Sequence, residues 1–109
     1  MKYNKVLIIG NKKYKVYFTN DDTERKKGLM GLKKIPDDWG ILFHWDNSDY
    51  YGIWMKNTEI PLDVIWIDEN KTIVAKKTLY PNTKDVVYPT TKSKYILEVN
   101  ANTFNGKVG

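Results

Sequence analysis

Short apolar runs separated by turn-forming residues constrain the fold of this chain more than any other feature. Runs of this length with β-branched and aromatic residues are typical of strands, and their close spacing favours an antiparallel sheet. The sequence therefore predicts a β-rich α+β fold, a mostly antiparallel small barrel or sandwich with one short helix. The predicted strands are Lys2–Ile9, Lys13–Thr19, Ile41–Trp45, Tyr51–Met55, Leu62–Asp68, Thr72–Leu79 and Tyr95–Val99.

Turns and the single helix are marked by local signals. Gly10–Lys12 and Glu69–Lys71 are expected to close two hairpins, with Asn70 at positive φ. Asp21 is a plausible N-cap, and Glu24 three residues later completes a capping box, so a helix is predicted to about Lys27, before Gly28. We expect a turn at Asp46-Asn47-Ser48-Asp49 and a long loop from Pro81 to Lys92.

Composition narrows the classes of function. At 109 residues the chain is expected to form a single domain, 1–109. The absence of cysteine excludes disulfides, thiolate metal sites and a cysteine nucleophile. With His44 as the only histidine, placed mid-run as a structural residue, no metal site and no cofactor is expected. Val6–Ile9 is too short for a membrane span. We therefore expect the protein in the cytoplasm, or in the virion if a phage encodes it.

The net charge of +5 raises the question of nucleic-acid binding. Only Arg25 among the 18 basic residues is an arginine, whereas base and phosphate recognition relies on the forked guanidinium donors. The lysines are scattered in pairs between acidic residues. No specific nucleic-acid partner is therefore expected. The expected binding partner is a small ligand or another protein, and the sequence does not decide between them.

The candidate site lies in GIWMKNTEIPLDVIWID, Gly52 to Asp68, where a polar island separates two apolar runs. The candidate binding residues are Trp54, Lys56, Asn57, Thr58, Asp63 and, in a separate loop, Trp39. Trp54 and Trp66 sit inside strand-like runs and are expected mainly in the core, while Trp39 is the best candidate for an exposed aromatic.

Asp63 is the most informative residue of this stretch. Alternation places Leu62, Val64 and Trp66 on one face and Asp63 with two isoleucines on the other. A carboxylate in such surroundings must be paired or hydrogen-bonded. We predict that Asp63 is buried and accepts hydrogen bonds from the Lys56–Pro61 loop, in preference to a role in ligand binding or catalysis.

Four strings of the sequence resemble a known family. They are GLM (Gly28–Met30), GILF (Gly40–Phe43), WMKNTEIPLDVIWID (Trp54–Asp68) and YILEV (Tyr95–Val99). Together they make residues 13–109 similar to the domain of unknown function 192 family, an uncharacterised ancient conserved region of bacteria, archaea and phages. The resemblance implies a compact β-rich domain and no established activity.

Two classes of function follow from these observations. The favoured one is a small non-enzymatic binding or accessory domain with its site at the Trp54–Asp63 loop. If the gene is carried by a phage, this class includes a virion-associated or host-modulating role. The alternative is an envelope-directed hydrolase that uses Asp63 and Glu24 as general acid and base. Two carboxylates in one cleft would favour the hydrolase, and a lone Asp63 bonded within the protein would favour the binding domain.

Overall fold

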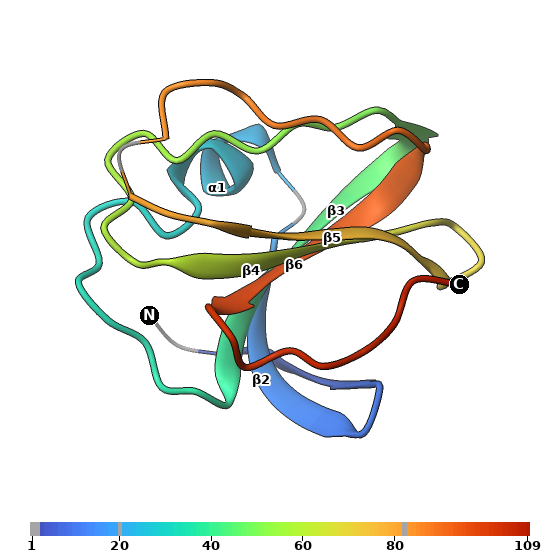
Figure 1. Cartoon of the computed structure of the whole chain (residues 1–109), viewed down its shortest axis with the longest axis horizontal. Helices are drawn as coiled ribbons and strands as arrows, with labels where there is room; N and C mark the ends of the chain where they lie inside the picture. Colours follow the sequence, from blue (N-terminus) through green and yellow to red (C-terminus); the bar gives the residue numbers. More distant parts are fainter. Residues whose placement is uncertain (1–2, 20, 82) are drawn as a thin grey trace.

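Six strands form one mixed sheet in the computed structural model, which describes residues 3–19, 21–81 and 83–109 (Figure 1). The strands are β1 (Lys5–Ile9), β2 (Lys12–Thr19), β3 (Trp39–Asp49), β4 (Leu62–Ile67), β5 (Ile73–Leu79) and β6 (Ser93–Asn100). Their spatial order is β1-β2-β3-β6-β4-β5, and only the β2–β3 pair is parallel. The predicted β-rich α+β class with one short helix is confirmed. The sheet is open rather than a closed barrel, because β1 and β5 are its two edges.

The helix α1 (Asp22–Lys27) begins and ends where the sequence predicts. The Asp21 side chain accepts a hydrogen bond from the Glu24 N–H at 2.8 Å, and Gly28 ends the helix with φ of 47°. The other half of the capping box is not formed, because the Glu24 carboxylate accepts a hydrogen bond from the Tyr17 hydroxyl instead. Within the described residues, no helix is long and apolar enough to cross a membrane.

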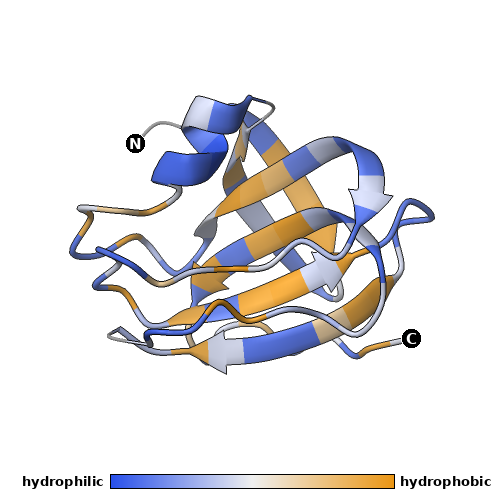
Figure 2. Cartoon of the chain, turned by 90° about the horizontal axis from the view of Figure 1, so that it is seen from above, coloured by the Kyte–Doolittle hydropathy of each residue, from blue (hydrophilic) through white to orange (hydrophobic). Residues whose placement is uncertain are grey.

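Both faces of the sheet are covered, and they have different covers. We call the face beneath α1 the helix-side face and the face beneath the segment after β6 the C-terminal face; Figure 1 shows the two covers on opposite sides of the strands. On β4, Leu62, Val64 and Trp66 belong to the helix-side cluster, whereas Ile65 and Ile67 pack on the C-terminal face, as the alternation predicts. Figure 2 shows a mostly hydrophilic α1, beside strands in which hydrophobic and hydrophilic residues are mixed.

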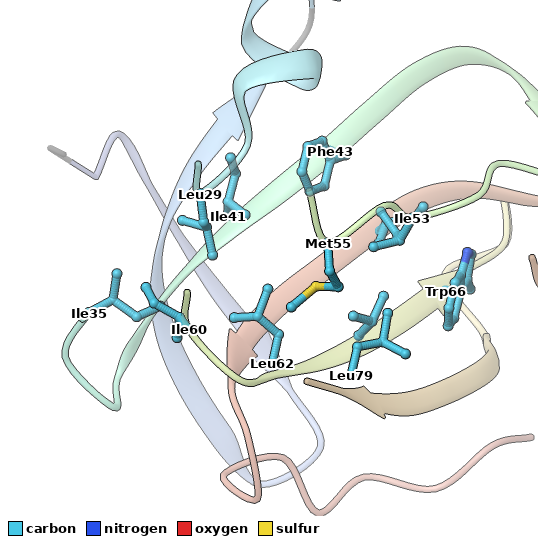
Figure 3. Packing of buried hydrophobic residues seen from close by; sticks show 12 residues of the cluster. Leu29, Ile35, Ile41, Phe43, Ile53, Met55, Ile60, Leu62, Trp66 and Leu79 are labelled. Carbon is cyan, nitrogen blue, oxygen red and sulfur yellow. The ribbon is translucent and has the colours of Figure 1, made fainter. Parts of the chain in front are cut away.

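The segment after β3 is held by packing rather than by a ladder. The predicted strand Tyr51–Met55 is wrong: only Ile53 forms a bridge, with Val87, through two hydrogen bonds of 2.9 Å. Ile53 and Met55 are buried, and Figure 3 shows Met55 in the middle of the helix-side cluster. We call the segment between β3 and β4, residues 50–61, the anchored loop, because its apolar side chains are buried alternately although its backbone does not join the sheet.

Three smaller expectations also differ from the structure. Asp46–Asp49 is not a turn, because β3 continues to Asp49 through an irregularity and pairs there with Ser93. In the β4–β5 hairpin the positive φ, 65°, belongs to Lys71 rather than Asn70, whose N–H is bound by the Asp68 carboxylate. Lys2, at the predicted start of the first strand, lies outside the described residues.

Candidate functional site

The carboxyl group of Glu98, in the middle of β6, is the most unusual polar group of the core. Glu98 pairs with Ile41 of β3 and Val64 of β4 and is 5% exposed. Burial raises the pKa of Glu98 to about 8, because removal from water penalises the charged form. Burial is the only cause of the shift, so no described side chain supplies a hydrogen bond or a compensating charge. Glu98 is therefore a largely neutral acid at pH 7.

Glu98 opens into a cavity of about 400 Å³ on the helix-side face, which we call the Glu98 cavity. A cavity of this volume is large enough for a small organic molecule. Its walls come from the end of α1, the loop that follows, β3 and the segment before β4. The lining residues are Arg25, Lys26, Lys27, Gly28, Leu29, Met30, Phe43, Trp45, Gly52, Ile53, Trp54, Lys56, Asn57, Thr58 and Glu98.

The outer wall of the cavity is positioned by the anchored loop. Buried Ile53 and Met55 fix it to the core, so that Trp54 between them is turned outward and remains 51% exposed. Asn57 takes a positive φ of 55°, and its carbonyl accepts a hydrogen bond from the Gly31 N–H at 3.1 Å. This bond ties the polar island to the loop after α1, and both loops line the Glu98 cavity.

An aromatic stack forms a second wall. Trp45 stacks on Tyr51 with ring centroids 3.8 Å apart, and on its other neighbour Phe43 at 6.1 Å. The backbone carbonyl of Tyr51 accepts a hydrogen bond of 2.8 Å from the Trp66 indole, which connects the stack to the buried core. Tyr51 covers one face of the Trp45 ring and the Arg25 guanidinium lies over the ring at 5.6 Å from its centre, so the position of this apolar side chain is fixed by its neighbours.

Four of the lining residues of the Glu98 cavity are basic. Lys26, Lys27 and Lys56 are exposed, and none of them forms an ion pair with a carboxylate in the described part of the chain. The Lys56 Nζ lies 5.0 Å from the centre of the Trp54 ring. The Arg25 guanidinium is committed to structure, since it donates to the His44 carbonyl at 2.7 Å and to Asp22 at 2.8 Å.

The candidate binding residues divide into those that line the Glu98 cavity and those, Trp39 and Asp63, that do not. Trp54, Lys56, Asn57 and Thr58 line the Glu98 cavity together. Trp54 contradicts the expectation of a core position, whereas Trp66 meets it at 1% exposure. Trp39 is only partly exposed: its ring meets Tyr3 edge-on at 5.5 Å, away from the cavity lining.

Asp63 lies on the opposite face of the sheet. It is buried, as predicted, at 7% exposure. Its carboxylate accepts hydrogen bonds from the Thr78 hydroxyl at 2.7 Å, the Thr103 N–H at 3.1 Å and the Phe104 N–H at 3.0 Å. The predicted donors in the Lys56–Pro61 loop were wrong, because the phase of β4 points Asp63 away from that loop. Asp63 instead fixes the C-terminal segment to the sheet.

Glu24 lines a neighbouring cavity of about 360 Å³ that shares Lys27, Gly28 and Met30 with the Glu98 cavity. Asp63 borders a separate depression of about 230 Å³ on the other face. Glu24 and Asp63 therefore do not face a common cavity. Among the described residues, no group of three or more acidic or histidine side chains is arranged to hold a metal ion.

Glu98 is not among the site residues predicted from the sequence, although a signal for it is present there. In Tyr95–Val99 a single carboxylate stands between apolar residues, and alternation places it with Ile96 on the buried face. The same argument that singled out Asp63 applies to Glu98. The pattern does not indicate that Asp63 accepts hydrogen bonds from the chain whereas Glu98 faces a cavity.

Comparison with protein families gives a match over nearly the whole chain. The model of the family described as an uncharacterized ACR, DUF192, matches residues 5–107. The chain belongs to the DUF192 family. The comparison with curated proteins finds no relative.

Two solved structures have the same fold. One is a protein of unknown function from Novosphingobium aromaticivorans, with a TM-score of 0.83 and 24% identity over 89% of this chain and 72% of that one. The other is a Sinorhizobium meliloti protein provisionally called a transcription regulator, with a TM-score of 0.85 and 29% identity over 94% of this chain and 85% of that one. The fold is thus established, and neither neighbour supplies an activity.

Proposed function

We propose that this DUF192 protein is a binding domain whose small-molecule ligand occupies the Glu98 cavity. The observation that carries the proposal is the Glu98 carboxyl, buried, without a described partner and facing that cavity. Buried polar groups in proteins are almost always hydrogen-bonded, and an unpaired one reduces stability. A buried carboxyl that faces a cavity and has no partner from the described chain is typical of a functional site.

The walls of the cavity support the same proposal. Fixed aromatic rings and a few polar groups around a concave space are the usual composition of a ligand site. The Trp45–Tyr51 stack and the bridge at Ile53 hold these walls before any ligand arrives. Pre-positioned walls lower the entropy that binding costs.

Acid–base catalysis by Glu98 is a second candidate function. A carboxyl with a pKa of about 8 is protonated near neutral pH and could serve as a general acid. The hydrolase with Asp63 and Glu24 as the acid–base pair has no support, since the two residues line different cavities. Turnover of a bound compound that is lost in Glu98→Gln would favour catalysis over binding alone.

The provisional name of the Sinorhizobium neighbour raises DNA binding as a further question. The helix described here has six residues, and its arginine is bound to His44 and Asp22. These features favour ligand binding over base recognition. The proposal does not extend to a virion-associated or host-modulating role, for which neither the fold nor the comparisons supply an observation.

A fragment screen followed by amide and indole chemical-shift mapping tests the proposal. Binding fragments should shift the Trp45 indole and the Gly28 amide, which line the Glu98 cavity. Trp54→Ala should raise the Kd of these fragments about threefold to tenfold, which corresponds to the loss of one aromatic contact. Tyr80→Ala, which removes an exposed aromatic outside the cavity lining, is the matched control. A screen without hits, or hits confined to the depression beside Asp63, would refute the proposal.

A further inference from the structure

The charges around the Glu98 cavity are of one sign. Every charged side chain in its lining except Glu98 is basic: Arg25, Lys26 and Lys27 from α1, and Lys56 from the anchored loop. Two carboxylates outside the lining already have partners: Asp22 is paired with Arg25 at 2.8 Å, and Glu24 of the adjoining cavity is bound by the Tyr17 hydroxyl. Lys26, Lys27 and Lys56 therefore supply the positive charge. A cleft lined by like charges concentrates ions of the opposite sign, here anions.

The inner end of the cavity offers a hydrogen-bond donor. The strand neighbours of Glu98, Ile41 and Val64, are apolar and cannot neutralise an ionised carboxylate. Glu98 is therefore held mainly as the neutral acid, whose O–H is free to donate. Hydrogen bonds from a carboxylic acid to an oxyanion are short and strong, because the acceptor is charged.

We infer that the ligand is a small organic anion, whose acidic group accepts a hydrogen bond from the Glu98 carboxyl while its apolar body lies against Trp54 and Trp45; this inference rests on the binding function proposed above. The basic side chains attract the anion, the Glu98 donor fixes its acidic group, and the exposed Trp54 and its neighbour in the lining, Trp45, offer apolar contact to its body. A cation would have to pass the lysines and ionise Glu98 before it could be held.

A set of three probes with the same phenyl ring, similar size and different charge tests the inference. Benzoate, benzamide and benzylammonium are titrated separately at pH 6.5 and pH 9, and the Trp45 indole and Gly28 amide report on the Glu98 cavity. The Thr83 and Lys84 amides report on the separate groove beside Trp54. Benzoate should bind best at pH 6.5. Its Kd should rise about tenfold at pH 9, because about nine-tenths of Glu98 is ionised one unit above its pKa while most lysines stay charged.

Glu98→Gln is the matched variant, since it keeps a donor of similar shape and removes the titration. We expect it to bind benzoate with little change in Kd between the two pH values. Native-like amide spectra show whether the variant is folded; if it is not, the pH dependence of the unmodified protein decides.

The outcomes separate the two proposals. Preference for benzamide or benzylammonium, or benzoate affinity that does not weaken at pH 9, overturns the anion inference and leaves the binding site in place. If no probe and no fragment of the wider screen shifts the cavity reporters, the binding function itself is wrong.

Discussion

Two buried carboxyl groups, Asp63 on β4 and Glu98 on β6, lie on neighbouring strands at positions offset by one residue in the pairing. This offset places them on opposite faces of the sheet, in different surroundings. Val99 pairs with Asp63, and the preceding residue, Glu98, pairs with Val64, so the two side chains point to different faces of the sheet. Asp63 accepts three hydrogen bonds. Glu98 has no described hydrogen-bond partner and faces a cavity.

The comparison shows that burial of a carboxyl does not by itself identify a functional site. Asp63 is nearly as buried as Glu98, yet its oxygens are used by the chain itself to hold the segment after β6. The useful distinction is whether the protein supplies partners for the buried group. Where it does not and the group also faces a cavity, as at Glu98, the partner is expected to come from outside; the buried Thr19 and Ser93 hydroxyls also lack partners but line none of the cavities described above.

The largest expected effect concerns the pH dependence of stability through Glu98. The folded-state pKa of about 8 is above the unfolded value near 4.3, so the folded state binds more protons between these pH values. The free energy of unfolding contributed by Glu98 is therefore fully present below about pH 4 and is lost as pH rises through 8. Relative to Glu98→Gln, the unmodified protein should lose on the order of 3 kcal/mol between pH 5 and pH 9 in urea unfolding. Parallel curves for the two proteins would contradict an unpaired Glu98.

The next effect concerns Asp63. Asp63→Ala removes the acceptor from the Thr103 and Phe104 N–H groups and should lower the free energy of unfolding by about 2–3 kcal/mol. Asp85→Ala, at an exposed carboxylate of the loop before β6, is the control and should change little. Chemical denaturation measures both. Equal stability of the two variants would show that Asp63 does not fix the C-terminal segment.

A smaller effect of opposite sign is expected when Glu98 is replaced by an apolar residue. Glu98→Leu removes an unpaired buried polar group and should raise the free energy of unfolding at pH 7 by about 1 kcal/mol. The same variant should no longer bind benzoate, because the donor is gone. Thermal unfolding and the probe titration measure the two results. A loss of stability like that of Asp63→Ala would mean that Glu98 is structural as well.

Most of the helix and strand positions could be predicted from the sequence, but whether the sheet closes into a barrel could not. Alternation on β4 and the Asp21 cap depend on neighbouring residues, and both were predicted correctly. The Tyr51–Met55 run was wrong because alternation reports which side chains are buried and not which strand, if any, the backbone joins. Whether the sheet closes depends on β1 and β5, which are far apart in the sequence.

The candidate site was predictable in part for the same reason. Trp54, Lys56, Asn57 and Thr58 are close in sequence and line one cavity. The donors to Asp63 come from Thr78, 15 positions later in the chain, and from Thr103 and Phe104, 40 and 41 positions later. The cavity facing Glu98 is formed by α1, β3 and the anchored loop together. Neither arrangement leaves a local pattern, so the two carboxylates cannot be told apart before the fold is known.

The smallest expected effect on stability tests the function most directly. Lys56 is exposed, and its contact with the Trp54 ring is worth little in water, so Lys56→Ala should change the free energy of unfolding by less than about 0.5 kcal/mol. Because Lys56 lines the Glu98 cavity, the variant should nevertheless weaken benzoate binding about threefold at low salt, and the difference should shrink as salt is added. Lys13→Ala removes another exposed lysine, outside that lining, and is the matched control. If the two variants bind benzoate equally well, the basic side chains do not attract the ligand, and recognition of the anion must depend on Glu98 alone.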